Sequence, residues 1–219
     1  MALPEGEPGE EYPGVVVVHE IFGLNDNIRR VADRFAGEGY AALAVDLFAG
    51  RRRVVCAARF INGMLTDSLG HEAIRDLKAS LGYLASLPQV DEGRLGAVGF
   101  SLGGSFVTAW ACTDDRLRAV ASFYGMNPRP LEAVRSSCPL VGSYPEKDFT
   151  ASQAQRLEQE LESRGVPHDI KIYPGARHSF FNESRSRVHD PAASADSWRR
   201  TLEFFVRNIG RSAQDQRAS

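Results

Sequence analysis

The sequence predicts an α/β protein with a doubly wound, mostly parallel sheet flanked by helices. Strand-like and helix-like segments alternate from residue 15 to residue 209, which implies βαβ units with right-handed crossovers. The first strand, Val15–Val18, is a continuous β-branched run, as expected of a strand that is buried on both faces of a parallel sheet. A length of 219 residues suits one domain. We therefore expect residues 1–219 to form a single domain in which residues 1–12 and 211–219 are flexible.

The expected strands are short apolar runs bounded by turn residues. In chain order they are Val15–Val18, Ala41–Val45, Leu95–Phe100, Leu117–Phe123, Leu140–Tyr144 and His168–Tyr173. The last run alternates between polar and apolar residues, which is typical of an exposed edge strand.

The expected helices carry apolar residues at helical spacing. In chain order they are Asn25–Phe35, Glu72–Leu87, Leu102–Cys112, Ser152–Arg164 and Ser197–Ile209. Glycines at 37 and 39 end the first helix, and Pro88 ends the second. The third is so apolar that it must be buried. Cys56–Met64 is one further helix candidate, in a stretch whose pattern is weak.

Composition excludes several classes of protein. The net charge of −2 provides no basic surface for nucleic acid or for an acidic membrane. No apolar run approaches the length of a membrane span, and the first residues lack a signal-peptide pattern. Three cysteines without CxxC spacing argue against a disulfide framework and a zinc site. We expect a cytoplasmic protein that needs no metal or cofactor and has no nucleic-acid or membrane partner.

The strongest chemical signal is Gly99-Phe100-Ser101-Leu102-Gly103, which lies between a predicted strand and a predicted buried helix. This is the G-x-S-x-G pattern of a nucleophile elbow, in which a strained turn holds the serine at the edge of the sheet. The amide that follows the serine, that of Leu102, then lies at a helix N-terminus, where it can stabilise an oxyanion. Ser101 is the predicted nucleophile.

A serine hydroxyl needs a base, and in this fold an acid and then a histidine follow the serine along the chain. Asp148 comes just after the strand at 140–144, with Glu146 as a nearby rival. His178 comes just after the strand at 168–173 and is flanked by aromatic residues. We predict Asp148 as the orienting carboxylate and His178 as the base.

Four stretches together resemble the dienelactone hydrolase family of the α/β-hydrolase superfamily. They cover the chain from about residue 14 to residue 207, and they are Val18–Leu24, Ala44–Phe48, Gly99–Gly104 and Arg177–Phe180. The resemblance implies hydrolysis of lactones or small esters without a cofactor. It also implies that the amides of Ile21 and Leu102 form the oxyanion hole, and that Glu20 is the active-site glutamate that interacts with the resting nucleophile. A simpler role for Glu20 is an ion pair with an arginine.

The chain departs from the family pattern at several positions. Ser101 stands where the best-known members have cysteine. Asn182 stands where the family has an arginine for the substrate carboxylate, and Arg51 is only an approximate counterpart of a second such arginine. The usual N-terminal hairpin is truncated, so we expect a smaller sheet.

These observations predict a serine hydrolase that cleaves a small ester or lactone through an acyl-enzyme on Ser101. Phe48, Arg51, Tyr124 and Phe180 are candidate substrate-binding residues. Two alternatives stay open: a non-catalytic ligand-binding protein of the same fold, and a thioesterase or peptidase that uses the same triad. The expected assembly is a monomer or a weak homodimer.

Overall fold

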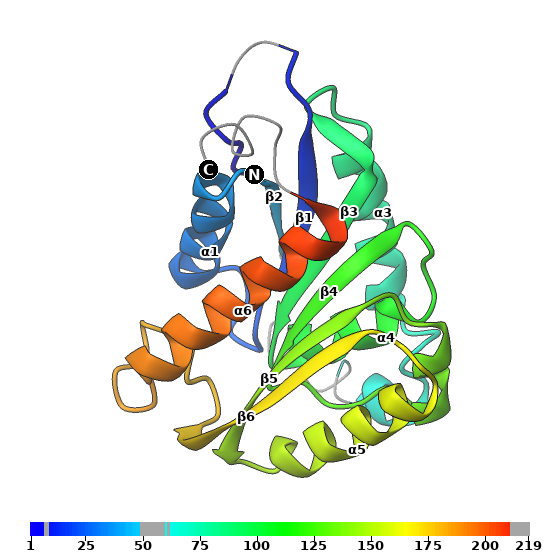
Figure 1. The fold of residues 1–219 in the computed structure, drawn as a ribbon, viewed down its shortest axis with the longest axis vertical. Helices are drawn as coiled ribbons and strands as arrows, with labels where there is room; N and C mark the ends of the chain where they lie inside the picture. The colour runs from blue at the N-terminus through cyan, green and yellow to red at the C-terminus, as the bar shows by residue number, and fades with distance from the viewer. Residues whose placement is uncertain (7–8, 49–59, 61, 211–219) are drawn as a thin grey trace.

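A parallel sheet runs through the centre of the computed structural model, which describes residues 1–6, 9–48, 60 and 62–210. Within this part of the chain the sheet has six strands in the order β2-β1-β3-β4-β5-β6, and each neighbouring pair is parallel (Figure 1). The strands are β1 (Tyr12–Val18), β2 (Ala41–Val45), β3 (Val90–Phe100), β4 (Leu117–Phe123), β5 (Leu140–Lys147) and β6 (His168–Arg177). The predicted parallel sheet is therefore confirmed, and β6 is an edge strand as expected.

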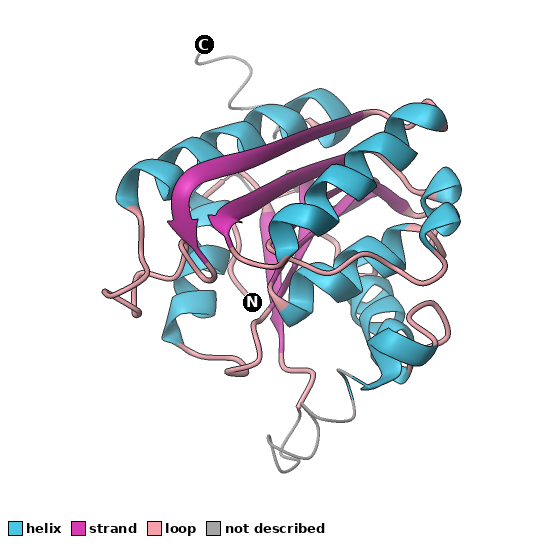
Figure 2. Cartoon of the chain, turned by 90° about the horizontal axis from the view of Figure 1, so that it is seen from below, coloured by secondary structure: helices cyan, strands magenta, loops and turns pink. Residues whose placement is uncertain are grey.

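Helices cover both faces of this sheet (Figure 2). They are α1 (Asp26–Gly37), α3 (Glu72–Ala85), α4 (Leu102–Ala111), α5 (Thr150–Ser163) and α6 (Pro191–Ile209), with a 3₁₀ turn, η1, at Leu131–Ser136. One core cluster joins α1 and α6 to one face through residues such as Phe35 and Phe205. The other joins α3, α4 and α5 to the opposite face through residues such as Leu77, Phe106 and Leu157. None of the helices in the described ranges is long and apolar enough to cross a membrane.

The strand order reverses between β1 and β3. From β1 the chain moves outward to β2, then crosses back to β3 on the other side of β1 and continues to β6. At such a reversal the loops beyond the carboxyl ends of the two central strands lead away to opposite faces, which opens a crevice. The loops that follow β1 and β3 therefore lie where α/β proteins usually have their ligand-binding and active-site residues.

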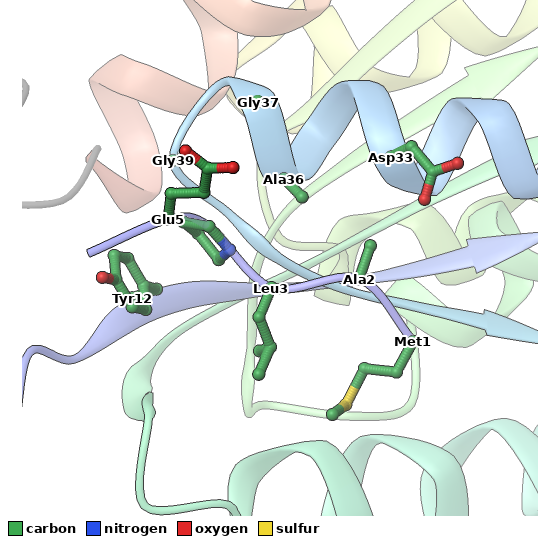
Figure 3. A pocket seen from close by; sticks show the side chains of 10 residues that line it. Met1, Ala2, Leu3, Glu5, Tyr12, Asp33, Ala36, Gly37 and Gly39 are labelled. Atoms are coloured by element: carbon green, nitrogen blue, oxygen red, sulfur yellow. The ribbon is translucent and has the colours of Figure 1, made fainter. Parts of the chain in front are cut away.

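The N-terminal segment is attached to the edge of the sheet at one point. Ala2 forms an isolated antiparallel bridge with Ala42 of β2, with N···O distances of 2.9 and 2.8 Å. Tyr12, at the end of the stretch expected to be flexible, is buried and begins β1. A hollow of about 500 Å³ lies between this segment and α1, with Met1, Leu3 and Asp33 at its edge (Figure 3). It lies at the amino ends of β1 and β2, away from the loops that follow the strands.

Several elements are longer than their sequence patterns predict. Helix α6 begins at Pro191 instead of residue 197, because the Asp190 side chain accepts the Ala193 N–H and Pro191 suits the first helical turn. Strand β3 starts at Val90 instead of residue 95. Strands β5 and β6 run past Tyr144 and Tyr173. In the segment with the weak helix pattern, residues 60 and 62–66 are helical, and the rest of that prediction lies outside the described residues.

Candidate active site

Ser101 lies on a strained turn between β3 and α4. Its φ of 53° is in the left-handed region, which a residue with a side chain occupies at a cost of about 1–3 kcal/mol. The turn is held by the Ser101 N–H, which donates to the Phe123 carbonyl of β4 at 2.9 Å. It also requires a glycine at 99, because a Cβ there would lie 2.2 Å from the Gly103 carbonyl oxygen. The G-x-S-x-G pattern thus has a steric cause in this structure.

Gly103 brings the end of β1 against the start of α4. A Cβ at this position would lie 2.5 Å from the Val18 carbonyl oxygen and 2.6 Å from that of His19. Only a glycine permits this backbone contact. The loop that carries Ile21 therefore lies beside the helix N-terminus that carries Leu102.

The three predicted catalytic side chains form one hydrogen-bonded chain. Ser101 Oγ lies 2.7 Å from His178 Nε2, and His178 Nδ1 lies 2.5 Å from Asp148 Oδ2. Asp148 directly follows β5 and His178 directly follows β6, so neighbouring parallel strands deliver both groups to the same edge of the sheet. The Asp148 carboxylate, which is nearly buried, accepts a second hydrogen bond from Thr150 Oγ1 at 2.7 Å.

Glu146, the rival of Asp148, and two other histidines of the chain have other partners. The Glu146 carboxylate accepts the N–H of Gly175, near the end of β6, at 2.9 Å. His71 caps α3 through the Ala73 N–H, and His168 Nδ1 bonds the Val166 carbonyl. The structure therefore brings Asp148, and not Glu146, to His178.

Both predicted oxyanion amides belong to residues that line the cavity beside Ser101. Leu102 is the first residue of α4, and a helix leaves its first N–H groups without intrahelical acceptors. Ile21 lies in the loop after β1 and is about one-third exposed. The two amides thus come from neighbouring segments on the side of the site where Gly103 contacts the β1 loop.

Within the described hydrogen bonds Glu20 is not bonded to Ser101, and the role that the family resemblance implies for Glu20 stays a prediction. Its buried carboxylate accepts a hydrogen bond from Asn182 Nδ2 at 2.5 Å, while the Ser101 hydroxyl is engaged by His178. Among the described residues the hydrogen-bond partner of this carboxylate is therefore an asparagine and not an arginine. The Asn182 amide is oriented by the Ser184 N–H, which donates to its Oδ1 at 3.0 Å.

Tyr124 lies near both Glu20 and His178. Its ring centroid is 5.0 Å from that of His178. Burial, and then the nearby Glu20 carboxylate, raise the pKa of the Tyr124 hydroxyl well above its ordinary value. The hydroxyl therefore keeps its proton. Of the three candidate substrate-binding residues that the structure describes, Tyr124 is the one that lines the cavity.

The cavity at Ser101 has a volume of about 450 Å³ and a mainly apolar lining. The described residues that line it, besides the triad, are Ile21, Leu102, Ser105, Tyr124, Met126 and Phe149. Phe48 and Phe180 are not among them; their rings pack in the core, against Phe60 and Tyr124 respectively. Arg51 lies outside the described residues.

Sequence reasoning missed three of the lining residues. Phe149 follows Asp148 directly, and its exposed ring lies nearly parallel to that of His178 at 6.2 Å. Its place next to a predicted catalytic residue was the available signal. Ser105 lies one helical turn after the nucleophile, and its Oγ accepts the Met126 N–H at 2.8 Å. Nothing in the sequence around Met126 indicates this contact.

Comparison with known proteins adds relatives over nearly the whole chain. A profile of the dienelactone hydrolase family matches residues 1–209. Protein usf of Aquifex pyrophilus is 30% identical over 88% of this chain and 87% of its own length. A Synechocystis protein, provisionally assigned as a carboxymethylenebutenolidase, is 31% identical over 89% of this chain and 86% of its own length.

The fold comparison agrees. A crystal structure from Klebsiella pneumoniae, provisionally assigned as a dienelactone hydrolase, superposes with a TM-score of 0.81 at 26% identity, over 93% of this chain and 90% of that one. The six-stranded parallel sheet with helices on both faces is thus an α/β-hydrolase fold. The chain belongs to the dienelactone hydrolase family.

Proposed function

We propose that this protein is a serine hydrolase that cleaves a small ester or lactone through an acyl-enzyme on Ser101. The observation that carries the proposal is the continuous chain from Ser101 Oγ to His178 Nε2 and from His178 Nδ1 to Asp148 Oδ2, at 2.7 and 2.5 Å. A nucleophile within hydrogen-bond reach of a base, which is in turn oriented by a carboxylate, is the arrangement that nucleophilic catalysis requires.

In this reaction His178 Nε2 takes the Ser101 proton while Oγ attacks the substrate carbonyl. Asp148 accepts the Nδ1–H and stabilises the imidazolium that forms. The oxyanion is stabilised by the N–H groups of Ile21 and Leu102, and one such donor contributes about 3 kcal/mol to the transition state. The imidazolium then protonates the leaving alkoxide. Water enters, gives its proton to Nε2 and hydrolyses the acyl-enzyme, which regenerates Ser101.

Two further observations support an ester or lactone as substrate. The cavity is open and mainly apolar, which suits a small organic acyl group better than an extended polar chain. The family to which the chain belongs is named for a lactone hydrolase, and the Synechocystis relative carries the name of a butenolide hydrolase.

Labelling with a fluorophosphonate, followed by peptide mapping, tests the proposal. We expect a single adduct on Ser101, together with hydrolysis of 4-nitrophenyl acetate and of a simple neutral lactone. His178→Ala should abolish labelling and turnover. His189→Ala is the matched control, because this second loop histidine lies outside the cavity lining and should leave both unchanged.

The outcomes separate the alternatives. A folded protein that binds small esters but neither reacts with the phosphonate nor turns them over would be a ligand-binding member of the fold. Labelling at Ser101 with turnover of acyl thioesters or peptides, but of no ester or lactone, would keep the triad and reject the proposed substrate class.

A further inference from the structure

The imidazole of His19 is buried directly behind the predicted oxyanion hole and is bonded at both nitrogens. Its Nδ1 lies 2.6 Å from the carbonyl oxygen of Glu20, and its Nε2 lies 3.0 Å from the backbone nitrogen of Leu47. A carbonyl oxygen can only accept and a backbone N–H can only donate. The ring is therefore neutral, with its proton on Nδ1 and a lone pair on Nε2 that accepts the Leu47 N–H.

The bond at Nδ1 fixes the direction of the Ile21 amide. The Glu20 carbonyl and the Ile21 N–H belong to one trans peptide unit, in which C=O and N–H point in opposite directions. Because the carbonyl points at the His19 ring, the N–H points away from it. Ile21 lines the cavity together with Ser101, so this is the donor that a reacting carbonyl would meet.

The bond at Nε2 anchors the ring to a second strand. Leu47 follows β2, and the turn at this point is closed by the Phe48 N–H, which donates to the Asp46 carboxylate at 3.0 Å. The Phe48 ring packs on the imidazole at 4.8 Å. The imidazole thus connects the loop after β1 to the loop after β2, which gives the ring an anchor outside the loop that it orients.

We propose that His19 is a positioning residue, which holds the Glu20–Ile21 peptide so that the Ile21 N–H is directed at the oxyanion. This inference rests on the proposed function, because the oxyanion exists only if Ser101 attacks a carbonyl. The Glu20 carbonyl also accepts the Gly23 N–H at 3.1 Å across the turn. The experiment must therefore show that the His19 bond contributes beyond that turn.

The charge state of the ring agrees with this role. Burial lowers the pKa of His19, although the bond to the Glu20 carbonyl and the nearby Asp46 carboxylate, 3.5 Å from Nε2, act in the opposite direction. The neutral ring is the form that can accept from Leu47 and donate to Glu20 together. A second proton on Nε2 would face the Leu47 N–H.

Two substitutions by amide side chains each remove one of the two His19 hydrogen bonds and keep the other. The side-chain nitrogen of asparagine can take the place of Nδ1, so His19→Asn keeps a donor to the Glu20 carbonyl and loses the acceptor for Leu47. The longer glutamine reaches the place of Nε2, so His19→Gln keeps the acceptor for Leu47 and loses the donor. Each variant loses one of two buried bonds, so we expect similar losses in unfolding free energy.

We expect the two variants, His19→Asn and His19→Gln, to differ in kcat. His19→Gln should lower kcat at least tenfold relative to His19→Asn at similar KM, within the 10²- to 10³-fold loss that follows complete removal of one oxyanion donor. The affinity for a trifluoromethyl ketone, which forms an oxyanion adduct with the serine, should fall in step with kcat/KM. Fluorophosphonate labelling of Ser101 checks in each variant that the triad is intact.

Equal kcat in the two variants, or a larger loss in His19→Asn, would overturn the inference. If the variants do not fold, nitrogen-15 NMR of the wild-type imidazole decides, because a neutral ring that carries its proton on Nε2 cannot hold the Glu20 carbonyl. A wild-type enzyme that is inactive on every ester and lactone and is not labelled would instead refute the proposed function, and this inference with it.

Discussion

The proton on Nδ1 of His178 determines which ring nitrogen can act as a base. The Asp148 carboxylate, whose Oδ2 lies 2.5 Å from Nδ1, has only acceptors to offer, so it favours a proton on Nδ1 and leaves the Nε2 lone pair facing Ser101 Oγ. The hydroxyl of Thr150 holds the carboxylate in turn. A change of one atom at residue 148 would therefore reach the nucleophile through the tautomer of the histidine.

Asp148→Asn tests this at the residue scale. An amide can donate to Nδ1 and so favour the tautomer that carries its proton on Nε2, which cannot accept from Ser101. We expect kcat for a 4-nitrophenyl ester to fall by about 10³- to 10⁴-fold, with little change in the unfolding free energy. Glu146→Gln is the control and should change kcat less than threefold, since that side chain bonds only the Gly175 N–H in the described contacts. A greater loss in Glu146→Gln would refute the assignment.

The sequence could predict the site residues that follow a motif or a fixed order along the chain. It could not predict those that reach the site only through tertiary contacts. Ser101 was predicted from a motif, and Asp148 and His178 from their places after successive strands. The partner of Glu20 could not be predicted in this way, because Asn182 is 162 positions away and the family pattern has an arginine at its position. The aromatic wall at Phe149 was missed because its ring contacts the histidine only once β5 and β6 are paired.

At the scale of elements, the site depends on how closely α4 approaches β1. The helix begins at Leu102, directly after the nucleophile, and Gly103 lies against the last carbonyl groups of the β1 segment. This contact sets the distance between the two predicted oxyanion amides. An added methyl group would meet backbone atoms, which cannot move aside as a flexible side chain can.

Gly103→Ala should therefore both destabilise the protein and lower its rate of ester turnover. We expect a loss of roughly 1–3 kcal/mol in unfolding free energy, as for other overpacked sites, together with a lower kcat because the elbow must shift. Gly37→Ala at the end of α1 is the matched control, because a Cβ there meets nothing within 4 Å. It should be neutral or stabilising by up to about 1 kcal/mol. Urea unfolding and ester turnover measure both, and a Gly103→Ala enzyme that resembles Gly37→Ala would contradict this account.

The element types could be predicted because buried parallel strands and amphipathic helices have different periodicities. The ends of the elements could not be predicted where polar residues continue a strand or where a capping residue begins a helix before its apolar pattern starts. The apolar pattern of α6 starts near Trp198, yet Asp190 and Pro191 begin the helix before it. Strand β5 continues through Glu146 and Lys147, whose exposed side chains resemble those of a loop.

At the scale of the whole molecule, α6 fixes the two strands that deliver Asp148 and His178. Arg200 of this helix is buried against the sheet and donates to Ser143 Oγ of β5 at 3.2 Å and to the Tyr173 hydroxyl of β6 at 3.0 Å. It also bonds the Asp169 carboxylate at 2.6 Å. One guanidinium thus joins the two strands that precede Asp148 and His178, which places α6 among the elements that position the candidate site.

The stability of the molecule as a whole should fall in acid. Asp91 and Asp196 have lowered pKa values, mainly because they accept hydrogen bonds from Arg94 and Lys171 respectively. At Asp114 burial acts to raise the pKa, but bonds from its neighbours outweigh it and the net shift is downward. A carboxyl group whose pKa is lower in the folded state stabilises the protein above its unfolded pKa, near 4, and this contribution is lost as the pH falls toward the folded value.

Asp114 is the most informative of these groups because its side chain is nearly buried. Its carboxylate accepts the indole N–H of Trp110 at 2.9 Å and binds Arg116 at 2.7 Å. Asp114→Asn should cost roughly 1–3 kcal/mol of unfolding free energy at pH 7. The difference in unfolding free energy between wild type and variant should become smaller below about pH 4, because protonation removes the same charge from the wild type. Asp115→Asn, at the exposed neighbouring position, should show no such convergence. Urea unfolding from pH 7 to pH 3 measures all three proteins. A gap that stays constant or widens in acid would show that the charge of Asp114 is not what stabilises the fold.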